Sequence, residues 1–181
     1  SPDKTKDEIS FCVIGSNDLD FSLILSLLKK CSVVKKCVLH IIGDWKKKED
    51  FIQSVLSVGV SVIDHKELHS VYSLQEVFDQ CHYSLNIFDS HIINKEALDY
   101  MCAGIPIINS TLGDLQNFCE LWNVGINVSF NNVKEIASMI CNEDMDSLLQ
   151  KRKNIQNLYN TYFSRKQFYK TLDDIQEELY E

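Results

Sequence analysis

The chain has 181 residues, of which 45% are hydrophobic and 24% are charged, an ordinary composition for a globular protein. This length predicts one domain with a substantial core. The formal net charge of −8 argues against a general nucleic-acid binder, because affinity for a phosphate backbone needs a basic face. Lysines gather at 29–36 and 46–48. No arginine or aromatic residue lies among them, so we interpret them as solvated helix ends.

Seven cysteines are scattered along the chain, and none falls in a CxxC pair or at zinc-ligand spacing with histidine. We therefore expect no metal site and a reduced, intracellular protein. No apolar run approaches the roughly 20 residues of a membrane span. Residues 1–8 lack the pattern of a signal peptide. We interpret residues 1–8 as the remnant of a linker, and we expect a cytoplasmic protein.

Short apolar runs alternate with amphipathic segments along the chain. The first half predicts, in order, strand 9–15, helix 19–31, strand 37–43, helix 46–59, strand 60–64 and helix 73–81. Ser73 is expected to cap the last of these helices, with Glu76 completing a capping box. The second half predicts strand 82–88, helix 94–103, strand 105–110, helix 114–122, strand 125–130 and helix 132–141.

Residues 143–181 contain no predicted strand and are expected to form two helices, broken near Ser164. In the second helix, one apolar stripe is formed by Phe168, Leu172, Ile175 and Leu179. We expect these helices to pack on the rest of the domain or on a missing partner.

Continuous apolar strands that alternate with helices are typical of a parallel sheet covered on both faces. The pattern over residues 9–142 predicts an α/β fold: a Rossmann-like, doubly wound, mostly parallel six-stranded sheet. Ligands of such sheets bind beyond the carboxyl ends of the strands. The loops that follow the strands therefore hold the candidate site residues.

Three features of these loops suggest a ligand site. Gly15 and Gly43 end two strands, where they either allow close approach of a ligand or form tight turns. The helix that begins near Asn94 offers free N–H groups and a positive dipole end, which suits a diphosphate. Asp99 lies beyond the first turn of that helix. Its carboxylate could accept two hydrogen bonds from a ribose diol, or it could be a solvated surface acid.

The histidines carry weaker signals. His40 lies inside a predicted strand and is interpreted as a satisfied core or interface residue. His65 and His69 flank the loop after the third strand, where a surface role and a ligand role are both open. His91 precedes the helix of Asp99 and contacts either a ligand or solvent.

The sequence lacks the motifs of several common classes of nucleotide-binding and catalytic site. No GxGxxG follows the first strand and no Walker A pattern occurs, which disfavours NAD, FAD and P-loop nucleotides. A receiver-type phosphoacceptor domain would need acids after strands one and three, and Asp18, Asp20 and Asp64 stand there. However, Asn109-Ser110 replaces the lysine expected after strand five. No residue falls in GxSxG or HExxH spacing, so no catalytic residue is identified.

The segment DYMCAGIPII (99–108) resembles the E-Y-M-A-A-G-x-P-V-I segment of the retaining GT-B glycosyltransferases, which use nucleotide sugars. Four more segments agree in order with that family: CVLHIIGD, VSVIDHKEL, LQEVFDQCHYSLNIF and TLGDLQNFCELWNVGINV. The resemblance covers about residues 9–140. It implies the C-terminal Rossmann half of such an enzyme, which binds the donor, while a missing N-terminal half binds the acceptor.

The resemblance also implies a set of substrate-binding residues: Gly15, Ser16, His65, His91, Asn94, Lys95 and Asp99. Asp99 would hold the ribose, and Gly15-Ser16 would lie near the donor phosphates and the acceptor. Residues 90–95 would cradle the diphosphate and sugar, and residues 65–68 would meet the base.

Two departures from the family pattern are visible. The family has two glutamates eight positions apart, whereas this chain has His91 and the shorter Asp99. The arginine and lysine that usually follow the first strand are absent. Lys95, or a residue of the missing half, is expected to replace them.

We therefore expect a donor-binding half that uses a UDP- or GDP-sugar, with no metal, no other cofactor and no nucleic acid. The whole enzyme would transfer a sugar to a glycan or lipid-linked acceptor in surface polysaccharide biosynthesis, in the cytoplasm or at the inner membrane face. The isolated chain is expected to be inactive. The alternative is a non-catalytic Rossmann module that has lost donor binding and serves as a scaffold.

Overall fold

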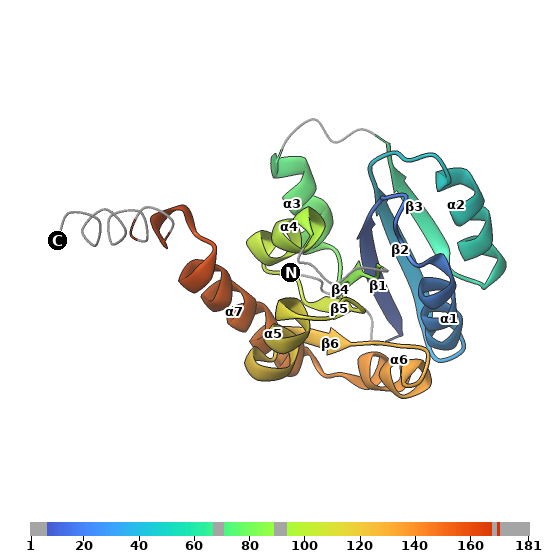
Figure 1. Cartoon of the computed structure of the whole chain (residues 1–181). Coiled ribbons are helices and arrows are strands. Elements are labelled where there is room, and N and C mark those ends of the chain that lie inside the picture. Colours follow the sequence, from blue (N-terminus) through green and yellow to red (C-terminus); the bar gives the residue numbers. More distant parts are fainter. Residues whose placement is uncertain (1–6, 67–70, 89–93, 168–169, 171–181) are drawn as a thin grey trace.

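The computed structural model describes residues 7–66, 71–88, 94–167 and 170. Six strands form one sheet in the order β3-β2-β1-β4-β5-β6, and all neighbours are parallel. The strands are β1 (Glu8–Ile14), β2 (Lys36–Ile42), β3 (Ser61–His65), β4 (Tyr83–Asn86), β5 (Ile107–Asn109) and β6 (Gly125–Asn127). The predicted doubly wound sheet is confirmed, and its topological switch point lies between β1 and β4 (Figure 1).

Helices cover both faces of the sheet (Figure 1). One face is covered by α1 (Phe21–Ser32), α2 (Lys48–Ser57) and α6 (Val133–Asn142). The other face is covered by α3 (Val71–Asp79), α4 (Lys95–Ala103), α5 (Asp114–Trp122) and α7 (Met145–Tyr162). Phe11 of β1 belongs to the first core and its neighbour Cys12 to the second, as a strand buried on both faces requires.

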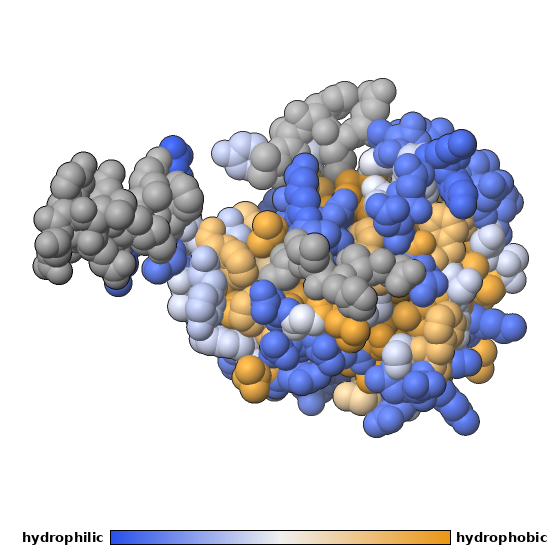
Figure 2. Space-filling model, in the orientation of Figure 1, coloured by the Kyte–Doolittle hydropathy of each residue, from blue (hydrophilic) through white to orange (hydrophobic). Residues whose placement is uncertain are grey.

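Local signals explain several of the helix ends. The Asp20 side chain caps α1 by accepting a hydrogen bond from the Leu23 N–H at 3.0 Å. Gly104 ends α4 with a φ of 70°, a left-handed conformation that glycine adopts without strain. The outer side of α2 carries mostly hydrophilic residues, as its charged sequence requires (Figure 2).

Some predicted boundaries are wrong. Helix α3 already begins at Val71, so Ser73 lies in its first turn and is not its cap. Helix growth adds one backbone hydrogen bond per residue, and this outweighs a local capping signal. β4, β5 and β6 are shorter than predicted. The ladder of β5 begins only after Pro106, which has no N–H to donate.

Helix α7 packs on the second core through Ile155 and Leu158. The helix is interrupted at 163–164 and helical geometry resumes at 165, as the predicted break near Ser164 requires. The apolar stripe predicted for 168–179 lies outside the described residues. Among the described residues, no helix combines the length and the apolar character needed to cross a membrane.

Candidate functional site

The loops that follow β1, β4 and β5 meet at the carboxyl edge of the sheet. Leu19 and Phe88 form an isolated bridge, and the Asp20 N–H donates to the Ile87 carbonyl at 3.0 Å. The Ser110 hydroxyl accepts from the Phe88 N–H and donates to the Phe88 carbonyl, both at 3.0 Å. These bonds hold three loops together at the switch point, where doubly wound sheets bind ligands.

The start of α4 offers an unused hydrogen-bond donor at this edge. Asn94 is the N-cap, and its Oδ1 accepts from the Ala97 N–H at 3.0 Å. Its Nδ2 is buried and has no partner among the described residues. A buried amide without a partner is costly, and the helix start adds a positive dipole end. Asn94 and the exposed Lys95 beside it could therefore bind an anion.

Three asparagines form a ladder across the carboxyl ends of β4, β5 and β6. Asn86 pairs in register with Asn109, and Asn109 with Asn127. The Asn86 Nδ2 donates to the Asn109 Oδ1 at 3.1 Å, and the Asn109 Nδ2 donates to the Asn127 Oδ1 at 3.0 Å. The Thr111 N–H and hydroxyl both donate to the Asn109 Oδ1. The ladder fixes the loop after β5, and it was not predicted from the sequence.

Tyr100 ties α4 to the two strands of the switch point. Its hydroxyl accepts from the Ile14 N–H at 2.7 Å and donates to the Leu85 carbonyl at 3.4 Å. The ring is fully buried, and this burial raises the pKa of Tyr100 well above its usual value. The phenol therefore stays protonated, and its two hydrogen bonds hold α4 against the sheet.

Gly15 allows a close approach, but the group that approaches is a side chain of the chain itself. The Gly15 N–H donates to the Ile42 carbonyl at 2.8 Å. A Cβ at Gly15 would overlap the Trp45 ring carbons Cε3 and Cζ3. Gly43 instead has a φ of 86° with open space beside it, which identifies it as a turn residue. Ser16 follows in the same loop, and its hydroxyl accepts from the Asp18 N–H.

Asp99 lies one turn further along α4 and is half-buried. Among the described residues it forms no hydrogen bond or ion pair. Its charge contributes to the raised pKa of Tyr100, although burial is the main cause. The carboxylate is therefore available for a ligand, and its role in ribose binding stays a prediction.

His65 is not part of this group of loops. It ends β3, which is separated from β4 by β2 and β1. Its Nε2 lies 3.1 Å from Nδ1 of the buried His40, with the two rings nearly parallel. His40 is thus a satisfied core histidine, as the sequence indicated. His91, Ser90 and residues 67–68 lie outside the described residues.

The lowered pKa of His65 should make the stability of the fold depend on pH. Burial lowers the pKa of His65 below its usual 6.5, against a smaller opposite effect of Asp64. Below pH 6.5 the unfolded chain binds a proton that the folded chain rejects. The contribution of His65 to the free energy of unfolding should therefore be constant above pH 6.5. Below pH 6.5 the free energy of unfolding should fall as the pH decreases toward the lowered pKa. Urea unfolding across this range should show a weaker fall for His65→Gln, and an unchanged fall would contradict the assignment.

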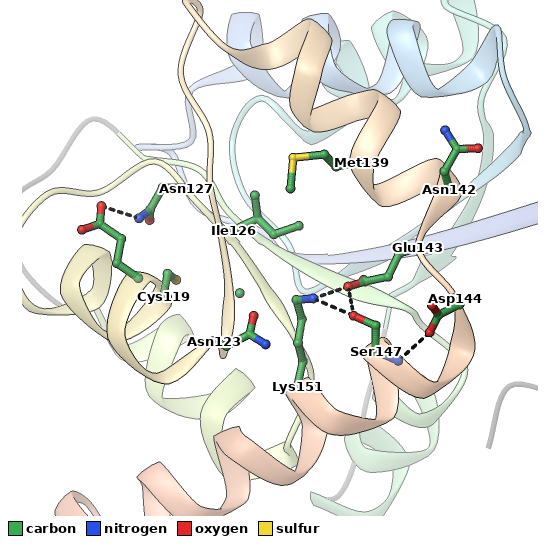
Figure 3. Close-up of a pocket in the computed structure, with 12 residues that line it drawn as sticks. Cys119, Asn123, Ile126, Asn127, Met139, Asn142, Glu143, Asp144, Ser147 and Lys151 are labelled. Atoms are coloured by element: carbon green, nitrogen blue, oxygen red, sulfur yellow. Dashed lines mark hydrogen bonds and ion pairs between the residues drawn. The ribbon is translucent and has the colours of Figure 1, made fainter.

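A cavity of about 530 Å³ lies beside the edge strand β6, between that strand and α5, α6 and α7 (Figure 3). The buried Lys151 pairs there with Glu143, and the Tyr83 hydroxyl donates to the same carboxylate. Ser147 also donates to Glu143 at 2.7 Å. Because these groups satisfy one another, the cluster is structural. A second cavity, of about 440 Å³, lies at the carboxyl ends of β2 and β3. The Lys48–Asp64 ion pair, at 2.6 Å, lines this cavity.

Across 7–66, 71–88, 94–167 and 170, no three histidine, cysteine or acidic side chains are arranged to hold a metal ion. The polar groups of the switch-point edge are mainly amides, hydroxyls and backbone N–H groups, together with the charged Lys95, Asp99 and Asp20. Such an edge suits a polar, anionic ligand that is held by hydrogen bonds and by a helix dipole.

No protein-family model matches the sequence, and no curated protein matches it. Solved structures do. WaaG, a glycosyltransferase involved in lipopolysaccharide biosynthesis, aligns with a TM-score of 0.72 and 15% identity, over 94% of this chain and 48% of WaaG. Anabaena HepE in complex with UDP aligns with a TM-score of 0.69 and 16% identity, over 93% of this chain and 49% of HepE.

The catalytic domain of the Helicobacter pylori cholesterol-alpha-glucosyltransferase aligns with a TM-score of 0.65 and 16% identity, over 86% of this chain and 99% of that domain. The chain thus spans about half the length of WaaG and HepE. It has the Rossmann-like fold found in GT-B glycosyltransferases, and the predicted resemblance is confirmed at the level of the fold.

Proposed function

We propose that this chain is the donor-binding half of a glycosyltransferase and that its ligand is a UDP- or GDP-sugar. The switch-point edge carries this proposal. Three loops are joined there beside the start of α4, where the buried Asn94 Nδ2 has no hydrogen-bond partner among the described residues. HepE, which shares the fold, was solved with UDP.

In this proposal the start of α4 binds the diphosphate through its free N–H groups, the Asn94 amide and Lys95. Asp99 accepts hydrogen bonds from the ribose, and Gly15 and Ser16 border the phosphates. By the family resemblance, we further propose that His65 contacts the base and that His91 contacts the sugar. Catalysis rests on positioning and on electrostatic support of the departing diphosphate, and it uses no metal.

The acceptor, a glycan or a lipid-linked glycan, would be bound by a second half outside this chain. The chain alone is then inactive in transfer but competent to bind the donor. We place the whole enzyme in surface polysaccharide biosynthesis, in the cytoplasm or at the inner membrane face.

A second candidate is a scaffold module that has lost donor binding. Two observations favour it: no arginine or lysine occurs between Gly15 and Leu28, and the Trp45 ring lies against Gly15. A diphosphate would then lack its usual cationic partners on the first loop.

A nucleotide titration separates the two candidates. We expect UDP or GDP at millimolar concentration to shift the amide NMR signals of Gly15, Asn94 and Asp99. Asp99→Ala should weaken nucleotide binding by about tenfold or more, because a hydrogen bond to a charged group contributes roughly 1.5 to 3 kcal/mol. The free energy of unfolding should change by less than about 0.5 kcal/mol, since the Asp99 side chain forms no hydrogen bond or ion pair with a described residue.

The control is Glu135→Ala, an exposed acid in the first turn of α6. It should change neither nucleotide binding nor stability. If neither nucleotide shifts any of the three signals, the scaffold candidate replaces the donor-binding one. If Asp99→Ala lowers stability and binding together, Asp99 is a structural residue.

A further inference from the structure

The turn between α1 and β2 exposes two branched apolar side chains. It has the sequence KKCSVVKK (29–36). Val33 is 84% exposed and Val34 is 54% exposed. The backbone below them is fixed, because the N–H groups of Val34 and Lys35 both donate to the Cys31 carbonyl at 2.9 Å. The turn therefore presents two valines on a rigid base.

Four lysines flank this apolar tip in an otherwise acidic chain. Lys29 and Lys30 close α1, and Lys35 and Lys36 follow the valines. Lys36 pairs with Glu8 at 2.8 Å, but its side chain is 67% exposed, and such surface pairs are weak. Asp7 is a neighbouring acid, and its backbone carbonyl accepts from the Lys36 N–H. The other three lysines form no ion pair with a described residue.

A rigid apolar tip ringed by lysines fits one class of partner best. A nucleic acid would bind the lysines but would gain nothing from the exposed valines. No aromatic or arginine side chain lies within residues 29–36 to contact bases. An anionic membrane surface can bind both the valines and the lysines, because apolar side chains enter the headgroup boundary while lysines contact the anionic lipids. Lysine stems can also cover apolar surface while their charged ends stay in water.

We propose that the α1–β2 turn docks this chain on an anionic lipid surface. Val33 and Val34 enter the headgroup region, and Lys29, Lys30 and Lys35 contact the anionic lipids. The turn lies at the amino edge of the sheet, opposite the switch-point edge. A docked chain therefore leaves its candidate ligand site facing away from the bilayer. The proposal does not depend on nucleotide binding.

Co-sedimentation of the 181-residue chain with lipid vesicles tests the proposal. We expect binding to vesicles that contain phosphatidylglycerol and none to pure phosphatidylcholine vesicles. Binding should disappear near about 1 M NaCl, where the Debye length is about 3 Å. Lys29→Gln with Lys35→Gln should weaken binding by about 25-fold, at about fivefold per lysine. Val33→Ser with Val34→Ser should weaken it by about tenfold.

Two matched controls separate docking from general effects. Lys134→Gln with Lys153→Gln removes the same charge from exposed positions of α6 and α7. Tyr72→Ser removes a side chain that is 85% exposed on α3. Neither control should change vesicle binding. The proposal is overturned if phosphatidylglycerol vesicles do not bind the chain at low salt, or if the controls weaken binding as much as the turn variants. It is also overturned if a DNA duplex binds equally well and the valine variant changes nothing.

Discussion

Gly15→Ala should lower the free energy of unfolding by about 1 to 3 kcal/mol, because the new methyl group overpacks the core. Its Cβ would overlap Cε3 and Cζ3 of the Trp45 ring and lie 2.8 Å from Cδ2. The ring cannot easily move aside, since Trp45 is 91% buried and packs against Phe51 at 5.9 Å between ring centroids. Urea unfolding of the purified chain measures the loss.

A double-mutant cycle identifies the cause of that loss. Trp45→Leu removes the ring and is itself destabilising. In that background Gly15→Ala should cost much less, because the backbone at Gly15 does not need a positive φ. If Gly15→Ala costs the same in both backgrounds, the overlap with Trp45 is not the cause. Nucleotide binding by the same variants shows separately whether the indole also restricts the ligand site.

The fold could be predicted because its signals are local. Strands buried on both faces appear as continuous apolar runs, such as the one that contains Phe11, Cys12 and Val13. The end of α4 could be predicted for a similar reason, because Gly104 marks a left-handed turn. The short β5 and β6 were predicted too long, because an apolar run continues past the last residue that forms a ladder bond.

The candidate site could be predicted only in part. The start of α4 at Asn94 could be predicted from the sequence, since an N-cap asparagine before a helical pattern is a local signal. The ladder of Asn86, Asn109 and Asn127 could not be predicted from the sequence, because it depends on which strands become neighbours in the sheet. The contact of Trp45 with Gly15 depends on β1 and β2 lying side by side. The one signal available was an asparagine near the end of each of three apolar runs.

The buried ion pair beside this cavity-lining edge, between Lys151 and Glu143, is a further feature that the sequence conceals. Lys151 lies in a helix rich in charged and polar residues, where a lysine is normally interpreted as solvent-exposed. The structure buries it to 6% exposure, against Glu143. Glu143 also accepts from Tyr83 and Ser147, so one carboxylate joins β4, the end of α6 and α7.

Lys151→Met should therefore be among the most destabilising substitutions in the chain. It leaves the Glu143 carboxylate buried without its cation, and breaking a buried pair in this way costs about 3 to 5 kcal/mol. Adding Glu143→Gln removes the uncompensated charge. Its amide oxygen can still accept from the Ser147 hydroxyl, and its amide N–H can donate to the Tyr83 hydroxyl oxygen. The double variant should recover most of the loss.

Lys153→Met is the matched control, two residues along the same helix and exposed, and it should change stability by less than about 0.5 kcal/mol. Urea unfolding measures all three variants. A Lys151→Met variant as stable as the control would mean that the pair contributes nothing. If the double variant loses more than Lys151→Met alone, the penalty does not come from the unpaired carboxylate. The cost would then lie in the packing of the lysine stem against the cavity wall.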